Sequence, residues 1–223
     1  VAPTQVIVQK SRFEVDLNRP REKAVYRKPE DAWGLHVWKD SLSHDDVQQS
    51  LAVYDAFYCE MHSLLAGMVH RYGKVVMLDL HSYNHRRLGP DMPADDVREN
   101  PEVNIGTGTM NRRHWASVVD RFIVDLRNHD YLVSRGPRSG GPHLDVRENI
   151  KFRGGYLAQW IHTHFAESVC VLSIEFKKFF MDEWTGEPFR EHIDAVLRAL
   201  KSTVWGIHEE LVKLHREPEE VLP

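Results

Sequence analysis

Two short apolar runs constrain the fold of this chain more than any other feature. They are KVVMLDL, residues 74–80, and VCVLSIEF, residues 169–176. Because neither run alternates apolar with polar residues, both are typical of strands that are buried on both faces of a sheet. Such sheets are covered by helices on either side. Each run also leads into a polar residue, since His81 follows the first and Glu175 ends the apolar part of the second.

Helical patterns lie between and around these strands. Gly73 offers a C-terminal cap for the first helix, and Asn111 offers an N-cap for the second. From the spacing of apolar residues, the predicted helices cover residues 45–72, 111–127, 156–165 and 187–215. Strands that alternate with helices predict an α/β fold with a mixed, mostly parallel central sheet flanked by helices.

The remaining segments have weaker patterns. Residues 5–8 and 11–18 alternate apolar and polar side chains, which indicates extended structure. Two further strands are predicted at residues 103–109 and 131–135, and two long loops at residues 88–102 and 135–156. A chain of 223 residues without an evident linker or internal repeat is expected to form a single domain over residues 1–223.

Composition limits the functional classes. The net charge is -4, and the basic residues do not form a large cluster in the sequence. We therefore expect no nucleic-acid partner. No apolar run approaches the roughly 20 residues that a membrane span needs, so we expect no membrane partner either. The cysteines, Cys59 and Cys170, lie in helix-like and strand-like runs and are predicted to be buried free thiols. Two cysteines without a disulfide framework favour a cytoplasmic protein.

The polar ends of the apolar strands are the first candidates for a functional site, because ligands bind beyond the carboxyl ends of strands in α/β sheets. An imidazole on a rigid strand end, such as His81, suits a zinc ligand, and Asp79 is placed to orient it. A half-buried carboxylate such as Glu175 suits a general base. Two plainer interpretations stay open, a histidine bonded to a loop carbonyl and a glutamate paired with a nearby lysine or arginine.

The segment DLNRP, residues 16–20, is a third candidate. Asn18 and Arg19 stand where an extended segment gives way to a loop, and Arg12 precedes them. An arginine fork binds a carboxylate with two hydrogen bonds, and an asparagine adds a neutral donor. A surface arginine is the alternative. The sequence has no HExxH segment and no cysteine–histidine cluster, so no complete metal site can be recognised in it.

Several short motifs, taken in order, resemble those of one family. They are DLNRP (16–20), LDLHS (78–82), VNIGT (103–107), KFRGGY (151–156) and IEFKKFFMDE (174–183). In their order and spacing the chain resembles the N-formylglutamate amidohydrolases, a branch of the zinc carboxypeptidase-like and aspartoacylase-like amidohydrolases. The resemblance extends from about Arg12 to the final helix.

The resemblance implies a zinc-dependent hydrolase with a mixed α/β sandwich of the zinc carboxypeptidase (phosphorylase/hydrolase-like) type. By the family's motifs, His81 corresponds to the third zinc ligand and Glu175 to the general base that activates water. Asn18 and Arg19 correspond to the pair that holds the substrate carboxylate. Further contributions to the pocket are expected from Arg12, Arg86 and Tyr156.

One part of the family's pattern has no counterpart here. The family's first two zinc ligands, a histidine and an acidic residue, precede the DLNRP element. Only seventeen residues precede Asn18, and none of them is histidine, while Glu14 and Asp16 lie too close to the element to match. Because the chain begins with Val1, we expect an N-terminal segment with two of the three zinc ligands to be missing from it.

The expected function is metal-dependent hydrolysis of the amide bond of an N-acyl amino acid, with N-formyl-L-glutamate as the first candidate substrate. Two alternatives stay open. One is an inactive module of the same fold that binds small carboxylates, and the other is a metallo-carboxypeptidase that acts on short peptides. The only partner expected is a small-molecule substrate, and the sequence gives no oligomeric state.

Overall fold

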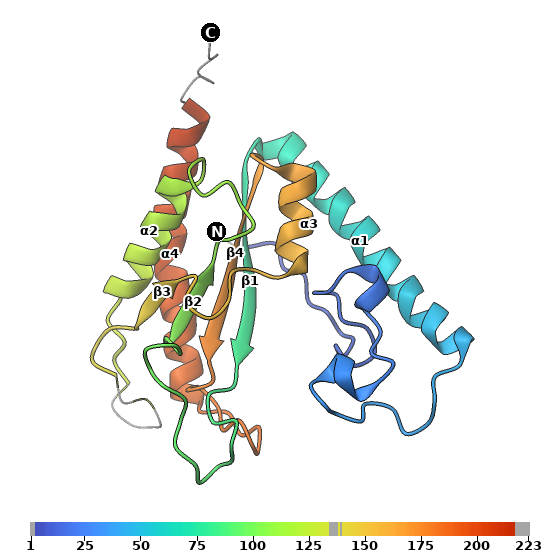
Figure 1. The fold of residues 1–223 in the computed structure, drawn as a ribbon. Helices are drawn as coiled ribbons and strands as arrows, with labels where there is room; N and C mark the ends of the chain where they lie inside the picture. Colours follow the sequence, from blue (N-terminus) through green and yellow to red (C-terminus); the bar gives the residue numbers. More distant parts are fainter. Residues whose placement is uncertain (1–2, 134–137, 139, 217–223) are drawn as a thin grey trace. The chain divides into compact units, whose positions relative to one another are not determined.

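The structure is a computed structural model that describes residues 3–133, 138 and 140–216. The chain divides into two compact units, Val1–Gly67 and Met68–Pro223, and each is described by itself (Figure 1). The single domain expected over residues 1–223 stays a prediction. Within the described residues, no helix is both long and apolar enough to cross a membrane.

The first unit is built on a long helix. It contains the 3-10 helices η1 (Arg21–Lys23) and η2 (Pro29–Ala32) and most of α1 (His44–Tyr72), whose last turn belongs to the second unit. The hydroxyl of Tyr54 donates to the backbone oxygen of Arg19 at 2.9 Å, and that of Tyr58 to the backbone oxygen of Leu17 at 2.7 Å. Helix α1 therefore holds the backbone of the DLNRP segment in place.

The extended structure predicted at the beginning of the chain is wrong for residues 11–18. Residues 11–14 form a turn in which the amide of Glu14 donates to the backbone oxygen of Ser11 at 2.9 Å. Residues 5–8 are irregular and belong to no strand. Alternation of side chains is not enough to make a strand, because the backbone groups also need a neighbouring strand to pair with.

The second unit contains a four-stranded sheet. Its strands are β1 (Val75–Tyr83), β2 (Val103–Gly106), β3 (Val146–Glu148) and β4 (Val169–Lys177), in the order β1-β4-β2-β3. β1 is parallel to β4 and β2 is parallel to β3, whereas β2 and β4 are antiparallel. The predicted α/β fold with a mixed, mostly parallel sheet is confirmed.

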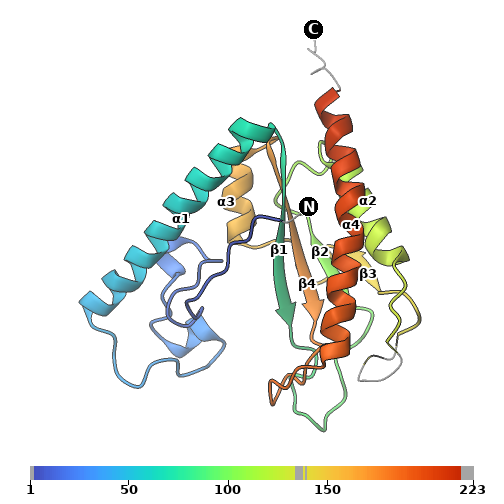
Figure 2. The same cartoon turned by 180° about the vertical axis from the view of Figure 1, so that it is seen from behind.

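Helices lie on both faces of this sheet. α2 (Ala116–Asn128) and α4 (Arg190–Arg216) lie on one face and α3 (Tyr156–Phe165) lies on the other (Figures 1 and 2). Cys170, Leu172 and Ile174 of β4 belong to the buried core that α2 and α4 cover. Because successive residues of a strand point to opposite faces, Ser173, Glu175 and Lys177 of β4 point to the face that carries α3.

Three other sequence predictions differ from the structure. Strand β3 lies inside the segment predicted as a loop at 135–156, because its strand state comes from pairing with β2. Residues 131–133 are irregular, while residues 134–135 of that predicted strand lie outside the described residues. Cys170 is buried as predicted, but Cys59 is exposed, because it lies on a face of α1 that does not pack.

Candidate active site

One row of residues crosses the sheet on the α3 face. The Cα partners are His81 of β1 with Glu175 of β4, and Glu175 with Asn104 of β2. The neighbouring row pairs Asp79 with Ser173. Residues in register point to the same face, so these five polar side chains project together. The structure therefore brings together His81 and Glu175, which the sequence singled out separately.

Asp79 contacts the histidine of this row. Oδ2 of Asp79 lies 2.9 Å from Nε2 of His81, and the side chains are 9% and 29% exposed, respectively. The two atoms are close without hydrogen-bond geometry, and an imidazole is oriented by a hydrogen bond to a carboxylate, so the orienting role expected for Asp79 stays a prediction. Ser173 is buried next to Asp79, and its hydroxyl has no hydrogen-bond partner among the described residues.

Helix α3 covers the amino-terminal half of the same face. Nε2 of His162 accepts a hydrogen bond from the amide of Val171 at 3.1 Å, so the ring proton lies on Nδ1, 2.9 Å from the hydroxyl of Thr109. Burial lowers the pKa of His162 to about 4, which keeps the ring neutral. Tyr156, the first residue of α3, also belongs to this unit.

The loop after β3 is fixed to the sheet by Asn104. Oδ1 of Asn104 accepts hydrogen bonds from the amides of Ile150 at 3.0 Å and Lys151 at 2.9 Å, while Nδ2 donates to the backbone oxygen of Phe152 at 2.8 Å. Asn104 is fully buried. A buried side chain that forms hydrogen bonds with so many backbone groups of the loop fixes the conformation of that loop.

A second histidine–carboxylate pair joins the segments that follow β1 and β4. The amide of His85 donates to Oε2 of Glu183 at 2.9 Å, and Nδ1 of His85 lies 3.3 Å from Oε1 of Glu183. Burial, together with the charges of Lys177 and Arg86, lowers the pKa of His85 to about 4. Arg86 itself donates to the backbone oxygen of Pro90 at 3.2 Å. This pair was not predicted from the sequence, although Glu183 ends the IEFKKFFMDE motif.

In the first unit, the buried carboxylate of Asp16 organises the DLNRP segment. It accepts hydrogen bonds from Nη2 of Arg12 at 2.8 Å, from the hydroxyl of Tyr26 and from the amide of Asn18 at 3.0 Å. Burial opposes ionisation of Asp16, but the bonds from Tyr26 and Arg12 outweigh it and hold the pKa below the ordinary value. Asp16 was considered in the sequence only as a metal ligand, and this role was not predicted.

Arg19 is held by groups of the same unit. Its guanidinium lies 4.5 Å from the ring centroid of Tyr26 and 5.2 Å from that of Trp33, and Nη1 donates to the backbone oxygen of Asp31 at 2.9 Å. Nε lies 3.5 Å from the carboxylate of Asp16. These contacts fix the orientation of the guanidinium, which is the property that recognition of a carboxylate requires.

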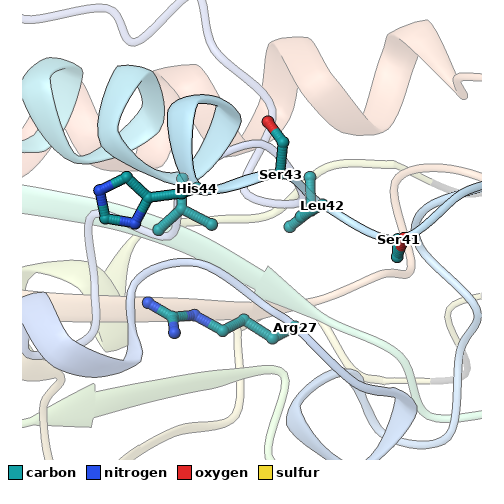
Figure 3. A pocket seen from close by; sticks show the side chains of 6 residues that line it. Arg27, Ser41, Leu42, Ser43 and His44 are labelled. Carbon is teal, nitrogen blue, oxygen red and sulfur yellow. The ribbon is translucent and has the colours of Figure 1, made fainter.

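The first unit also contains a hollow of about 250 Å³ (Figure 3). Its lining residues are Arg27, Ser41, Leu42, Ser43, His44 and Val47. None of the residues predicted for the functional site lines it. Of those, Arg12, Asn18 and Arg19 lie in the first unit, while His81, Arg86, Tyr156 and Glu175 lie in the second.

The sequence matches the N-formylglutamate amidohydrolase family over residues 2–181. The chain belongs to this family. The match confirms the resemblance seen in the sequence motifs, and it identifies the protein as a member of an amidohydrolase family. No curated protein sequence matches the chain.

Two solved structures have a similar fold. The N-formylglutamate amidohydrolase of Ralstonia eutropha JMP134 has a TM-score of 0.58 and 18% identity, over 92% of this chain and 74% of its own. A gene product of Agrobacterium tumefaciens has a TM-score of 0.53 and 18% identity, over 89% of this chain and 68% of its own. At such low identity, these likenesses support the fold alone.

The donor groups of the described residues do not complete a zinc site. A catalytic zinc ion needs three protein ligands. Nε2 of His81 is turned to Asp79, and within the described residues no three His, Cys, Asp or Glu side chains are grouped to hold a metal ion. His81 and Asp79 alone fall short of that set.

Proposed function

We propose that the protein hydrolyses the amide bond of an N-acyl amino acid, with N-formyl-L-glutamate as the first candidate substrate. Membership of the N-formylglutamate amidohydrolase family supports the reaction class. The observation that carries the proposal is the adjacency of Glu175 and His81 on one face, at the carboxyl ends of the buried strand β4 and the edge strand β1. Ligands of α/β proteins bind at such an edge.

Glu175 is proposed as the general base. Its carboxylate takes a proton from the water that attacks the amide carbonyl, and it passes that proton to the nitrogen of the leaving amine. The C–N bond breaks, and N-formyl-L-glutamate yields formate and glutamate. Glu175 is partly exposed at the end of a buried strand, so it is both accessible and held by a rigid element.

Substrate binding is proposed for the basic and polar residues that the family motifs select. Asn18 and Arg19 hold the substrate carboxylate in this proposal. The fixed guanidinium of Arg19 supports that role, since a planar fork loses little freedom on binding. The remaining candidates are Arg12, Arg86 and Tyr156.

Zinc is proposed as the metal, with His81 as one ligand. The proposal rests on the family likeness and on the strand-end position of this imidazole beside Asp79. Zinc bound by the purified protein is measured directly, by elemental analysis and by competition with a chelator. His81→Ala should lower the zinc affinity, and an unchanged affinity would remove His81 as a ligand.

The test of the reaction is release of formate from N-formyl-L-glutamate, measured with and without added zinc. The comparison substrates are N-acetyl-L-glutamate and a set of dipeptides with a free carboxylate. Formate release that is lost in Glu175→Gln supports the proposal. Cleavage of the dipeptides alone would favour the carboxypeptidase, and the absence of any turnover would reject the hydrolase.

An inactive module that binds small carboxylates is the second candidate. It is favoured by the fixed guanidinium of Arg19, which can bind a carboxylate without a metal. Such a module would bind N-formyl-L-glutamate without releasing formate, whether or not zinc is present. Calorimetric binding together with the formate assay separates the two candidates.

A further inference from the structure

Two lysine side chains lie beside the row of His81 and Glu175. Lys177 comes two residues after Glu175 at the end of β4 and therefore points to the same face. Lys151 lies in the loop that Asn104, the register partner of Glu175, fixes through a 2.9 Å hydrogen bond to the Lys151 amide. Both lysines are half-buried.

Asn100 holds the two ammonium groups at one place. Nζ of Lys151 lies 2.5 Å from Oδ1 of Asn100, and Nζ of Lys177 lies 3.1 Å from its backbone oxygen. Asn100 is 3% exposed, and its amide nitrogen donates to the backbone oxygen of Asp96 at 2.8 Å. Nζ of Lys151 also lies 5.3 Å from the ring centroid of Tyr83. The positions of both charges are thus fixed by buried groups.

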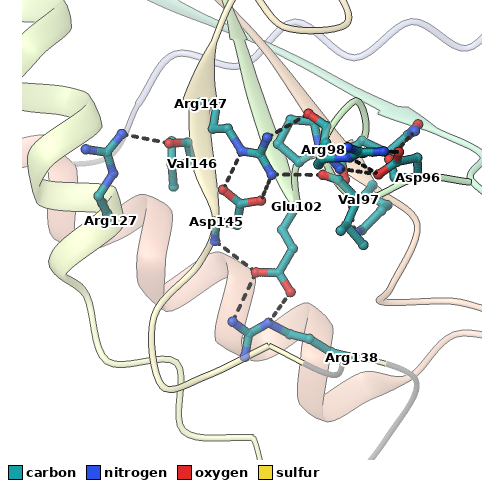
Figure 4. A network of polar contacts seen from close by, with 12 residues as sticks. Asp96, Val97, Arg98, Glu102, Arg127, Arg138, Asp145, Val146 and Arg147 are labelled. Carbon is teal, nitrogen blue, oxygen red and sulfur yellow. Dashed lines mark hydrogen bonds and ion pairs between the residues drawn. The ribbon is translucent and has the colours of Figure 1, made fainter.

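Two carboxylates near the lysines, those of Glu102 and Asp145, are paired with arginines (Figure 4). Nε of Arg138 lies 2.7 Å from Oε1 of Glu102, and Nη2 of Arg147 lies 2.5 Å from Oδ2 of Asp145. Within the described part of the chain, neither of the two lysines has a carboxylate at ion-pair distance. Glu102 and Asp145 attract Lys177 only from beyond that distance, so neither lysine is directly paired with an acidic side chain.

An unmatched charge that is half-buried is unfavourable, and an anion bound next to it removes much of that cost. Burial lowers the pKa of Lys177, which is the expected sign of such a charge. An ammonium group has three donors, and Asn100 uses one donor from each lysine. Donors therefore remain for a ligand.

We propose that Lys151 and Lys177 form a subsite for the side-chain carboxylate of an acidic N-acyl amino acid. Each ammonium group donates to one carboxylate oxygen. The subsite lies beside Glu175, the candidate catalytic base. Because its two ammonium groups bind a carboxylate, the subsite selects substrates with acidic side chains over those with neutral ones. The identity of the ligand rests on the proposed function, whereas the binding of a dicarboxylate does not.

The first experiment measures binding of glutarate and of butyrate, which differ by one carboxylate, by calorimetry on the full chain. In Lys151→Met and Lys177→Met, the Kd of glutarate should rise about tenfold or more, because a charge-assisted hydrogen bond is lost. The Kd of butyrate should not change. Lys178→Met is the matched control and should bind glutarate like the wild type. Unchanged glutarate affinity in both variants would overturn the subsite.

A second experiment needs no variant and so cannot be confounded by misfolding. The wild-type protein is reductively methylated with and without glutarate, and the rate at each lysine is measured by mass spectrometry. Glutarate should slow the modification of Lys151 and Lys177 severalfold and leave that of Lys178 unchanged. Equal rates at all three lysines, with and without glutarate, would refute the proposal.

Failure of the subsite and failure of the proposed function give different results. Glutarate binding that depends on the two lysines, without formate release from any N-formyl amino acid, rejects the hydrolase and retains the subsite. The opposite result is formate release from N-formyl-L-glutamate and N-formyl-L-glutamine with equal kcat/KM, unaltered in Lys151→Met and Lys177→Met. That result rejects the subsite and retains the hydrolase.

Discussion

Glu175 lies directly beside His81 in the parallel ladder between β4 and β1, and both side chains point to the face that carries α3. A base on this strand end is held by backbone pairing on both sides, to β1 and to β2. Rigid placement of this kind is what a catalytic carboxylate requires.

Replacing Glu175 by glutamine keeps the size of the side chain and removes its basicity. We expect kcat for formate release to fall about 100-fold or more, which is the usual contribution of a general base. Glutarate affinity should be retained, because the lysine charges are untouched. Glu187→Gln changes an exposed glutamate and serves as the control, with kcat near the wild-type value. A Glu175→Gln variant with wild-type kcat would exclude Glu175 as the base.

Asp16 is expected to stabilise the first unit. Asp16→Ala leaves Arg12 and Tyr26 without their buried acceptor, and we expect the free energy of unfolding to fall by about 3 kcal/mol. Tyr26→Phe removes one hydrogen bond to the same carboxylate and should cost less, about 1.5 kcal/mol. Urea unfolding followed by circular dichroism measures both. Equal stability of the wild type and Asp16→Ala would contradict the role of this carboxylate.

The same carboxylate makes a contribution that depends on pH. The pKa of Asp16 is lower in the folded chain than its ordinary value of 3.8, so the folded state releases this proton more readily than the unfolded state. The stabilisation is complete above 3.8 and is lost as the pH falls through the folded pKa. Asp16→Asn should therefore flatten the acid end of the stability profile, whereas an unchanged profile would argue against the linkage.

How much the sequence could predict differed between elements. The strands β1 and β4 were predictable because each is a continuous apolar run, and the strand-end rule then selected His81 and Glu175. β3 was not predictable, because Val146–Glu148 takes its strand state from pairing with β2. The hydrogen bonds by which Asn104 fixes the loop could not be predicted either, since its partners lie more than forty residues away in the sequence.

The buried histidines of the second unit should make it sensitive to mild acid. The pKa of His162 falls from 6.5 to about 4 through burial, so the unfolded state binds a proton first as the pH decreases. Stability should therefore decline between pH 6.5 and 4, by on the order of 3 kcal/mol for this group. His85 acts in the same direction. His162→Gln should reduce the slope in stability scans across this range, while His208→Gln, at an exposed position, should not.

The last prediction concerns the contact between β2 and the loop that carries Lys151. A Cβ atom added to Gly106 would lie 2.5 Å from the amide nitrogen of Gly154 and 2.9 Å from the carbonyl carbon of Arg153. Both are backbone atoms, so the loop itself would have to shift. We expect Gly106→Ala to lower the free energy of unfolding by about 2 kcal/mol, the usual cost of overpacking.

The shift of the loop should also weaken ligand binding, because it moves Lys151 away from Asn100 and from Lys177, the other lysine of the subsite. Glutarate affinity should therefore fall in Gly106→Ala even under conditions where the variant is fully folded. Gly67→Ala is the matched control. A Cβ atom at Gly67 meets nothing within 4 Å, and alanine is favoured over glycine within helix α1, so stability should rise by about 0.5 kcal/mol with glutarate affinity unchanged. If Gly106→Ala kept wild-type glutarate affinity, the loop position would not matter for the subsite, and the link between Asn104, the loop and Lys151 would be wrong.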